Sequence, residues 1–435
     1  MKFTIKKNDF KQLMITLLGI MILYLFVMNS NVVNDVILLV YLGGFLSISF
    51  LILAINKYNL ISVPVVFLVG YWFVIVLGPI VFELIGLSYF KYQLSLYFTS
   101  FILFYVGYYI LAPILIRKRE QCRPIHKRDS QPETLFLMSE VIFLVGVLAT
   151  GIYVLKNREF LLSGSVNDGR VTAMSGNGIW IYLGKLMWLG VFICAEQFLR
   201  EKKHKKIFYT MVLIAIVLSF LLGFRSAVVD AILVLLVMWN REKPIKKELL
   251  IFGCITLVVI FMCYSVIRSA TGSSITDEIY NELRVGSVNF NNIVNTFPRK
   301  ISFQHGYTYF INFIMILPGE DPDFTTWLKE ALNLTFSGGG VTPTIMGEFY
   351  INWGYIGIFI GMLFTGIFFR KIQNMYIWGN SIFVPSLFIG YIRSFIRGGF
   401  ANCFIIFIIY LVGYTFCHCF SAKHSVRIRT LSADK

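Results

Sequence analysis

The sequence predicts an all-α polytopic membrane protein with about 12 transmembrane helices and one large periplasmic loop. Of its 435 residues, 57% are hydrophobic and only 14% are charged, whereas soluble proteins average about 25% charged residues. Long apolar runs recur along the whole chain. These runs are continuous rather than alternating, which indicates helices rather than the strands of a barrel.

The apolar runs give the predicted spans in chain order. The first run follows the basic start MKFTIKKNDFK without a cleavage signal, so we expect it to be retained as a signal anchor. The later runs are mostly long enough to cross the hydrocarbon core as helices. The expected spans are 12–28, 36–55, 61–85, 94–116, 134–155, 178–199, 207–223, 226–239, 249–267, 344–369, 379–396 and 401–420.

Basic residues set the predicted orientation. With the N-terminus in the cytoplasm, about 26 of the 39 Lys and Arg fall on the cytoplasmic side, as the positive-inside rule requires. Both termini are then cytoplasmic. The expected division is residues 1–267 for transmembrane helices 1–9 with short cytoplasmic loops, residues 268–343 for the large periplasmic loop, and residues 344–435 for helices 10–12 and a cytoplasmic tail.

The composition argues against several other classes. The net charge of +16 follows from the positive-inside bias, so no nucleic-acid partner is expected. No glycine-rich phosphate loop precedes a lysine. The seven cysteines are typical of small helix-packing residues rather than of a disulfide framework. Asp321 and Asp323 flank a proline, which favours a turn over a metal site, so neither a metal nor a cofactor is expected.

Arginines on the outer side oppose the positive-inside bias and are therefore informative. Arg225 and Arg268 lie at outer helix ends, and Arg393 and Arg397 are four residues apart on one helix face. Together they could surround an anionic headgroup, because the guanidinium group donates paired hydrogen bonds to phosphate. The alternative is that each side chain extends separately to the membrane surface.

Four further charged residues lie within or beside predicted spans. Lys185 and Asp230 are expected about 7–10 Å below the outer surface, where they could form a structural ion pair or part of an ion path. Glu140 and Glu196 lie near the cytoplasmic side, where pairing or extension to the surface is the simpler expectation.

The stretch from Gly338 to Leu363 predicts a helix with two different faces. Thr342 could cap this helix, with Pro343 in its first turn. At about 100° per residue, four glycines share a packing face. Glu348 lies on the opposite face with Asn352 and Tyr355, so this carboxylate is expected at the outer mouth, either as a site residue or as a solvated helix-end acid.

His305 is the one histidine that the predicted topology places outside. It could act as a general base or donate a hydrogen bond to phosphate or sugar, or it could be an exposed loop histidine. Its neighbours Tyr307, Tyr309 and Phe310 could stack on sugar rings or bury the loop on the membrane helices.

These segments resemble a known family. FLLGFRSAVVD, an arginine just after a span, HGYTYFINFIMILPGEDPD and GGGVTPTIMGEFYINWGYIGIFIGMLFTGIF are similar to the bacterial O-antigen or oligosaccharide repeat-unit polymerases of the Wzy type. The resemblance runs from about Gly223 to Phe369, and the span count and single large periplasmic loop agree with it.

The resemblance implies a membrane glycosyltransferase in the bacterial inner membrane. Its substrates would be oligosaccharides on undecaprenyl diphosphate, and the growing glycan would pass to an incoming lipid-linked unit at the periplasmic face. His305 and Glu348 are the candidate catalytic residues, and the choice of base between them stays open. The candidate residues for binding diphosphate or glycan are Arg225, Arg268, Arg284, Arg393, Arg397 and Tyr307.

The resemblance also implies partners and leaves two rivals. Beyond the lipid-linked substrates and membrane lipid, a chain-length regulator and a flippase are the expected partners. The rival functions are a flippase or other transporter of the same lipid-linked unit, and an O-antigen ligase that uses a different acceptor. The long outer loop and the lack of a half-to-half sequence repeat count against a transporter.

Overall fold

The computed structural model describes residues 34–84, 91–116, 132–161, 173–174, 176–222, 224–246, 248–250, 253, 279, 283–317, 323–335 and 339–433. Within these residues the regular elements are helices, and singly or in succession they form seven segments that are long and apolar enough to cross a membrane. The prediction of an all-α polytopic membrane protein is therefore confirmed. The predicted spans 12–28 and 249–267 lie largely or wholly outside the described residues, and the total of about 12 stays a prediction.

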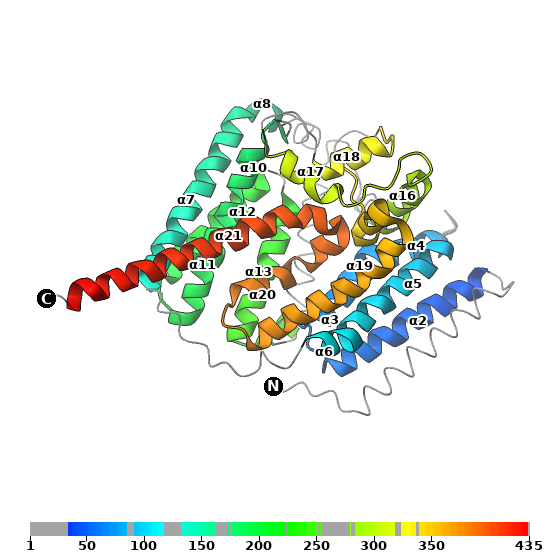
Figure 1. Cartoon of the computed structure of the whole chain (residues 1–435), viewed down its shortest axis with the longest axis horizontal. Helices are drawn as coiled ribbons and strands as arrows, with labels where there is room; N and C mark the ends of the chain where they lie inside the picture. The colour runs from blue at the N-terminus through cyan, green and yellow to red at the C-terminus, as the bar shows by residue number, and fades with distance from the viewer. Residues whose placement is uncertain are drawn as a thin grey trace.

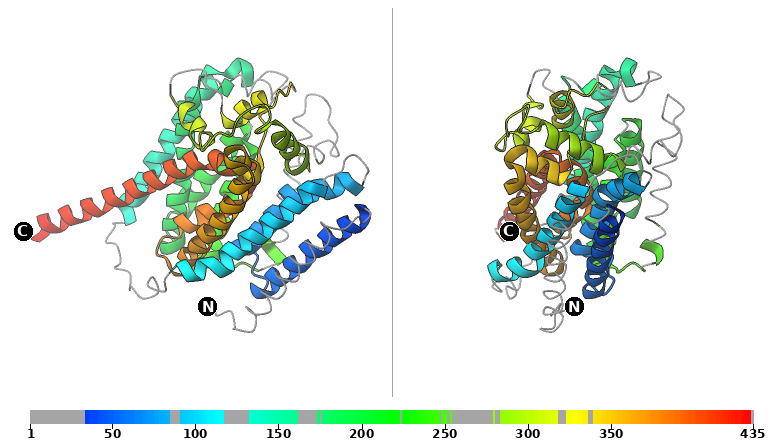
Figure 2. Two further views of the ribbon diagram at one scale, coloured as in Figure 1. Left: turned by 45° about the vertical axis from the view of Figure 1, so that its right-hand side comes forward. Right: turned by 90° about the vertical axis from the view of Figure 1, so that its right-hand side faces the viewer.

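The elements pack side by side as a bundle, with the short helices α16–α18 across one end (Figures 1 and 2). We call this the loop end. The helices are α2 (Asn34–Ile55), α3 (Val63–Tyr71), η1 (Trp72–Val76), α4 (Leu77–Leu84), α5 (Lys91–Val106), η2 (Gly107–Leu111), α6 (Ala112–Leu115), α7 (Pro132–Lys156), α8 (Arg158–Leu161), α10 (Gly178–Gly184), α11 (Leu186–Glu201), α12 (Lys205–Leu221), α13 (Arg225–Glu242), η4 (Val285–Asn289), α16 (Phe290–Thr296), α17 (Thr308–Ile314), α18 (Phe324–Ala331), α19 (Thr344–Trp378), α20 (Phe383–Gly390) and α21 (Ile392–Ala433).

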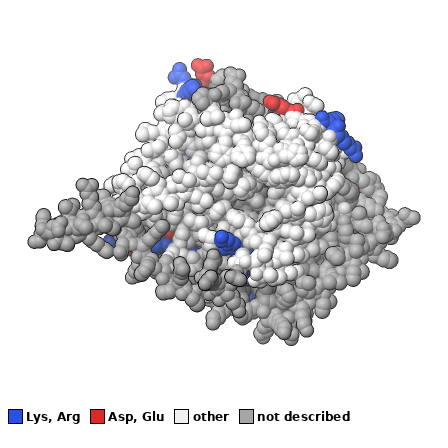
Figure 3. All heavy atoms as spheres, in the orientation of Figure 1, with Lys and Arg blue, Asp and Glu red and all other residues white. Residues whose placement is uncertain are grey.

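Charged side chains are unevenly distributed over the surface. In Figure 3 a broad face carries almost no charged atoms, while Lys, Arg, Asp and Glu appear above it at the loop end and below it. Exposed leucine, isoleucine and phenylalanine side chains on α2, α7 and α12 contribute to the apolar surface. An apolar belt between charged ends is the surface expected of a protein that crosses a bilayer.

Helix α19 is not one continuous helix. Trp353 (φ −143°, ψ 18°) and Gly354 (φ 62°, ψ −147°) break it, and glycine adopts this positive φ without steric cost. The short arm, residues 344–352, is buried and folds back on the long arm, since Gly361 lies so close to the Phe349 ring that an added Cβ would come within 2.5 Å of it. The prediction of one helix with two faces is wrong, since a constant 100° per residue does not extend through the break.

The start of α19 also differs from the prediction. The helix begins at Thr344, and the Gly347 N–H donates to Thr344 Oγ1 at 3.1 Å, so Thr344 rather than Thr342 supplies the capping hydroxyl. In the long arm, Gly366 lies against the backbone of η2, where an added Cβ would come within 2.8 Å of Tyr108 N. This close approach holds α19 against α5 and η2.

Helices α20 and α21 form an antiparallel hairpin. Aromatic pairs connect positions within one residue of equally far before and after Gly398: Phe395 with Phe400, Phe388 with Phe407, and Phe383 with Tyr414 at 4.8 Å between centroids. Gly399 has φ 77° and ψ −177°, so the chain reverses there and α21 consists of two helices joined at a kink. The hairpin has an ascending arm that ends at residue 398 and a descending arm from residue 400, close to the predicted spans 379–396 and 401–420.

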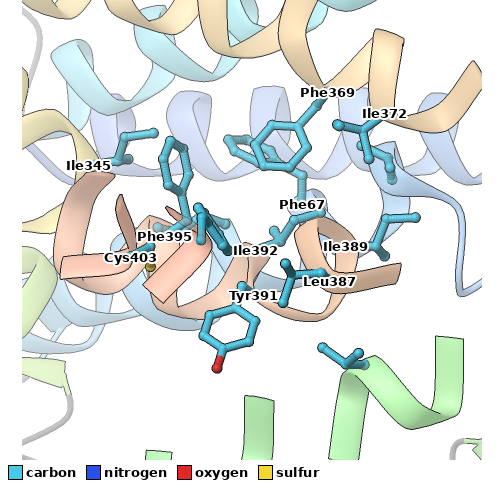
Figure 4. Packing of buried hydrophobic residues seen from close by; sticks show 14 of the residues in the cluster. Phe67, Ile345, Phe369, Ile372, Leu387, Ile389, Tyr391, Ile392, Phe395 and Cys403 are labelled. Carbon is cyan, nitrogen blue, oxygen red and sulfur yellow. The ribbon is translucent and has the colours of Figure 1, made fainter. Parts of the chain in front are cut away.

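The core lies between the hairpin, α19 and α3. Figure 4 shows Ile345, Phe369 and Ile372 of α19 facing Leu387, Ile392 and Phe395 of the ascending arm, with Phe67 of α3 between them. All of these residues are at most 6% exposed. This apolar packing fixes the two chain reversals, at Gly354 and Gly399, relative to each other.

Candidate functional site

The loop that carries His305 is attached to the break in α19. The His305 N–H donates to the Asn352 carbonyl at 3.2 Å, and the Gly306 N–H donates to Asn352 Oδ1 at 2.7 Å. Asn352 Nδ2 in turn donates to Thr308 Oγ1 at 2.7 Å and to the Glu348 carbonyl at 2.9 Å. Every polar atom of the Asn352 side chain is thus used to hold this loop. The His305 side chain itself is exposed.

Glu348 lies in the interior rather than at an open mouth. Its side chain is fully buried, and its carboxylate accepts the backbone N–H groups of Phe400 and Ala401, the latter at 2.8 Å. These are the first donors of the descending arm, where a carboxylate is favoured by the unpaired N–H groups and the helix dipole. The geometry makes Glu348 the cap that joins the α19 break to the Gly399 reversal.

Gly399 is required at this joint for two reasons. Its φ of 77° is one that residues with a side chain rarely adopt. An added Cβ would also lie 2.9 Å from Glu348 Cδ and closer still to Glu348 Oε2. We call the contacts of Asn352, Glu348, Gly399, Phe400 and Ala401 the carboxylate joint.

Aromatic side chains surround the joint. Tyr309 packs between Trp353 and Phe400, at 5.9 and 5.8 Å between centroids, which confirms for this residue that the loop is buried on the membrane helices. Burial, and next the charge of Glu348, raise the pKa of the Tyr309 hydroxyl, so it stays a neutral donor. Tyr307 and Trp353 remain 48% and 41% exposed beside His305. Flat exposed rings of this kind can stack on sugars.

Asp230 binds an arginine rather than the predicted lysine. Arg393 Nη2 donates to Asp230 Oδ1 at 3.0 Å and to the Ser226 carbonyl at 3.4 Å. The Ser394 hydroxyl donates to the other Asp230 oxygen. The expected Lys185–Asp230 pair is therefore wrong. The ascending arm brings Arg393 to Asp230 across the bundle, a long-range approach that sequence spacing cannot show.

The predicted arginines are only partly brought together. Arg225 is the first residue of α13, next to the Ser226 carbonyl that binds Arg393, so its backbone lies in the same region. Arg397 lies one turn beyond Arg393, is half-buried and precedes the Gly398–Gly399 reversal. Arg284 is exposed before η4, which packs on η1 and α4 instead. Arg268 lies outside the described residues.

One buried thiol lies within the electrostatic influence of four charged groups. Cys403 is 2% exposed, and the charges of Asp230, Glu348, Arg393 and Lys185 all act on it electrostatically. Figure 4 shows Cys403 at the edge of the apolar core and the Tyr391 hydroxyl pointing out of that core towards green-coloured helices. We call Lys185, Asp230, Arg393 and Glu348 the polar centre. Charged groups this deep in a membrane protein usually serve binding or transport.

The described residues do not support a metal site. They include no cluster of three or more His, Cys, Asp or Glu side chains that could hold an ion. Asp323, one of the acidic residues beside the proline, caps α18 by accepting the Thr326 N–H at 3.1 Å and the Thr325 hydroxyl at 2.7 Å. Asp321 lies outside the described residues.

A comparison with family models decides the family. The model described as O-antigen polysaccharide polymerase Wzy matches residues 11–425. The chain belongs to the Wzy family. Neither the curated proteins nor the solved structures gave a match. Membership in the Wzy family means that the protein is a glycosyltransferase-type polymerase that joins O-antigen repeat units, acts on lipid-linked oligosaccharides and is embedded in a membrane by several helices.

Several residues of the candidate site in this Wzy-family protein carry little signal in the sequence. Ser394 and Cys403 look like ordinary membrane-helix residues, yet one binds Asp230 and the other lies among the charges. Asn312 holds α17 to the descending arm through the Ala401 carbonyl at 3.1 Å and accepts the Phe324 N–H at 2.9 Å. An asparagine within an apolar run was the one available signal, because a buried amide must find partners.

Proposed function

We propose that the substrates are oligosaccharide repeat units on undecaprenyl diphosphate, and that the reaction takes place at the periplasmic face. The observation that supports this most is the polar centre with its neighbouring arginines at the loop end. Asp230 and Glu348 are already engaged, the first by Arg393 and Ser394 and the second by two backbone N–H groups. Further cations and N–H donors nearby leave this region suited to an anion.

The proposed reaction needs no nucleotide. A hydroxyl of the acceptor unit attacks the anomeric carbon of the growing glycan, a new C–O bond forms, and the bond to the diphosphate oxygen breaks. The leaving group is undecaprenyl diphosphate. Arg225, Arg393 and Arg397 hold its phosphates and stabilise the negative charge that develops on them. Arg284, Tyr307 and the region of Arg268 bind glycan or headgroup.

His305 is the proposed base, and Glu348 is a positioning residue. His305 is exposed at the loop end, where an acceptor hydroxyl can reach it, and it takes the proton of that hydroxyl. Glu348 has no exposed surface, and its oxygens are occupied. Through Asn352 on one side and Phe400 on the other, it fixes the His305 loop relative to the Gly399 reversal, which directly follows the turn that carries Arg397. The base and the cations are thus held on one rigid unit.

The cell context follows from the same proposal. The protein lies in the bacterial inner membrane, with both termini cytoplasmic and residues 268–343 as the periplasmic loop between helices 1–9 (residues 1–267) and 10–12 (residues 344–435). A flippase that delivers the lipid-linked unit to the outer leaflet must act before it. A chain-length regulator would act on the growing product.

The test is a reconstituted polymerisation assay. Purified protein in nanodiscs is given an undecaprenyl-diphosphate-linked repeat unit, and the products are separated by length. We expect a ladder of polymers from the wild-type protein and from His204→Ala, and none above background from His305→Ala. Single repeats moved across a vesicle membrane without chain growth would instead show a transporter and overturn the proposal.

A further inference from the structure

Lys185 lies beside a small hollow that the proposed mechanism does not use. The cavity measures about 30 Å³, enough for a few ligand atoms or a water. It opens between the loop-end halves of several helices: Thr150 and Tyr153 of α7, Trp180 of α10, Ser219 of α12 and Phe224 before α13. Lys185 is the only charged side chain in its lining.

Within the described part of the chain no carboxylate forms a salt bridge with the ammonium group of Lys185, although the charge of Asp230 acts on it from a greater distance. It lies 5.2 Å from the centroid of the Phe224 ring, a cation–π contact. Asp230, the acid that the sequence suggested for it, is bound by Arg393 and Ser394 instead. A lysine placed this deep without a carboxylate is costly, and such residues usually mark a ligand path.

The cavity adjoins the arginine region through the first turn of α13. Phe224 and Ala227 line the cavity, while the Ser226 carbonyl between them accepts a hydrogen bond from Arg393. Lys185 and Arg393 therefore approach the same helix start, which itself carries unpaired N–H groups and the positive end of the helix dipole. Two cationic side chains and a helix N-terminus therefore lie close together, and Asp230 neutralises one of the two cationic charges.

The wall of the cavity is held rigidly. Trp188 Nε1 donates to Ser219 Oγ at 3.0 Å, which joins α11 to α12. Gly184 lies so close to α7 that an added Cβ would come within 2.7 Å of Thr150 Oγ1. The lysine thus has a fixed apolar and aromatic surrounding in which a charge-assisted hydrogen bond to phosphate is stronger than in water.

We propose that Lys185 and this cavity form an additional phosphate subsite that binds one phosphate oxygen of the polyprenyl diphosphate substrate. The inference rests on the proposed function for the identity of the ligand. This subsite would add a lysine, located between α10 and α11, to the arginines of α13 and the hairpin that are proposed to bind the diphosphate. The same chemistry could come from the headgroup of a bulk anionic phospholipid, and the experiment separates the two sources.

The experiment measures binding without chain growth. Full-length protein in nanodiscs of zwitterionic lipid is titrated with undecaprenyl diphosphate that carries no glycan. Lys185→Met keeps the length and apolar stem of the side chain, and we expect it to weaken binding about tenfold or more. The matched control is Lys205→Met, because Lys205 also lies over an aromatic ring, Tyr209 at 5.9 Å, but outside the cavity and at the other end of α12. Unchanged affinity in Lys185→Met would overturn the proposal.

Two further measurements keep the outcome decisive. On the wild-type protein, undecaprenyl diphosphate should protect Lys185, but not Lys205, from an amine-acylating reagent, as followed by mass spectrometry; this needs no variant to fold. If phosphatidylglycerol protects Lys185 equally well at the same concentration, the substrate assignment fails. Lys185-dependent binding without polymerisation would refute the proposed function alone, whereas polymerisation with binding independent of Lys185 would refute this subsite alone.

Discussion

Two buried carboxylates cap the two arms of the hairpin, at opposite ends of the bundle. Glu196 accepts the Ile382 N–H at 3.2 Å where the ascending arm begins, and Glu348 accepts the Phe400 and Ala401 N–H groups where the descending arm begins. Both side chains are fully buried. The two carboxylates differ in their neighbours. Those neighbours make the Glu196 region a structural cluster and the Glu348 region a candidate site.

The Glu196 cluster is complete in itself. Arg200 binds Glu196 at 2.7 Å, so of the two expectations for this residue, pairing or extension to the surface, the structure shows pairing. The Tyr414 hydroxyl donates to the other Glu196 oxygen at 2.9 Å. Arg200 and Arg241 also bind backbone carbonyls of residues 379–381. Each charged group of this cluster has a partner within the chain, so the cluster stabilises the turn at residues 379–381.

The Glu348 joint has no such neutralising cation on its carboxylate within the described residues. Its partners are backbone N–H groups. The nearby cations do not bind it, because Arg393 binds Asp230 and Lys185 lines a cavity. Exposed His305, Tyr307 and Trp353 lie beside it. The comparison teaches that a buried acid alone does not mark the site; the exposed histidine and aromatic side chains beside the Glu348 joint distinguish it from the Glu196 cluster.

The largest expected effect comes from the histidines. His305→Ala should lower the turnover number about 10²- to 10⁴-fold, because a general base contributes that much, while thermal stability stays unchanged for an exposed side chain. His204 shares the left-handed backbone (φ 59° against 47°) but stacks on Phe136 at the opposite end. Equal losses of turnover in His204→Ala and His305→Ala would remove the base assignment.

The next effect separates the two carboxylates directly. Glu348→Ala leaves two N–H groups without partners, which should cost about 2–5 kcal/mol of stability and also lower turnover per folded molecule at least tenfold, because the base loop and the arginine arm lose their shared support. Glu196→Ala should lower the melting temperature similarly, with turnover per folded molecule intact. The measurements are the melting temperature and initial polymerisation rates normalised to folded protein.

A glycine substitution tests the joint from its other side. Gly399→Ala should destabilise the protein by about 1–3 kcal/mol, because the residue has a positive φ and its Cβ would meet the Glu348 carboxylate. Gly151→Ala in α7 is the matched control, since nothing lies within 4 Å of an added Cβ there. Equal melting temperatures for the two variants would contradict the described reversal.

The Asp230–Arg393 pair should have a smaller effect on stability and a specific one on binding. In Asp230→Asn the Arg393 guanidinium loses its ionic partner, so we expect a change of about threefold to tenfold in KM for the lipid-linked substrate. A double-mutant cycle with Arg393→Gln measures the coupling. Additive effects of the two substitutions would show that the pair does not act together.

The smallest expected effect concerns the exposed rings. Trp353→Leu should raise KM for the lipid-linked repeat about twofold to fivefold, because a stacking surface for sugar is lost while the break at Gly354 is kept. Trp378→Leu, which removes a ring that is 46% exposed at the far end of α19, tests whether the effect is local. A lower turnover number with unchanged KM would argue against glycan stacking.

Much of the fold follows from the sequence, because membrane insertion depends on local hydropathy. The helices at 34–55, 63–84, 91–115, 132–156 and 178–201 match predicted spans within a few residues. The break at Trp353–Gly354 escaped prediction because it depends on the distant loop at His305–Thr308, whose groups bind Asn352. Patterns of 100° per residue contain no information about such partners.

In the candidate site, too, local features could be predicted from the sequence, whereas features that depend on distant partners could not. The position of Arg393 and Arg397 on one helix face near a chain reversal could be predicted from their spacing and the following glycines. The choice of Arg393 rather than Lys185 as the partner of Asp230 could not, because it depends on which helices lie side by side. Glu348 was expected at an open mouth because the short buried arm of α19 gives no separate hydropathy signal.

The central claim is tested most directly by locating the substrate. The protein is reconstituted with an undecaprenyl-diphosphate-linked repeat that carries a photoreactive group next to the diphosphate, and crosslinked peptides are identified by mass spectrometry. The account predicts crosslinks at the start of α13 and on the ascending arm, around Arg225 and Arg393, and their loss with excess unlabelled undecaprenyl diphosphate. Crosslinks confined to the opposite end, around Glu196 and Arg241, would contradict it.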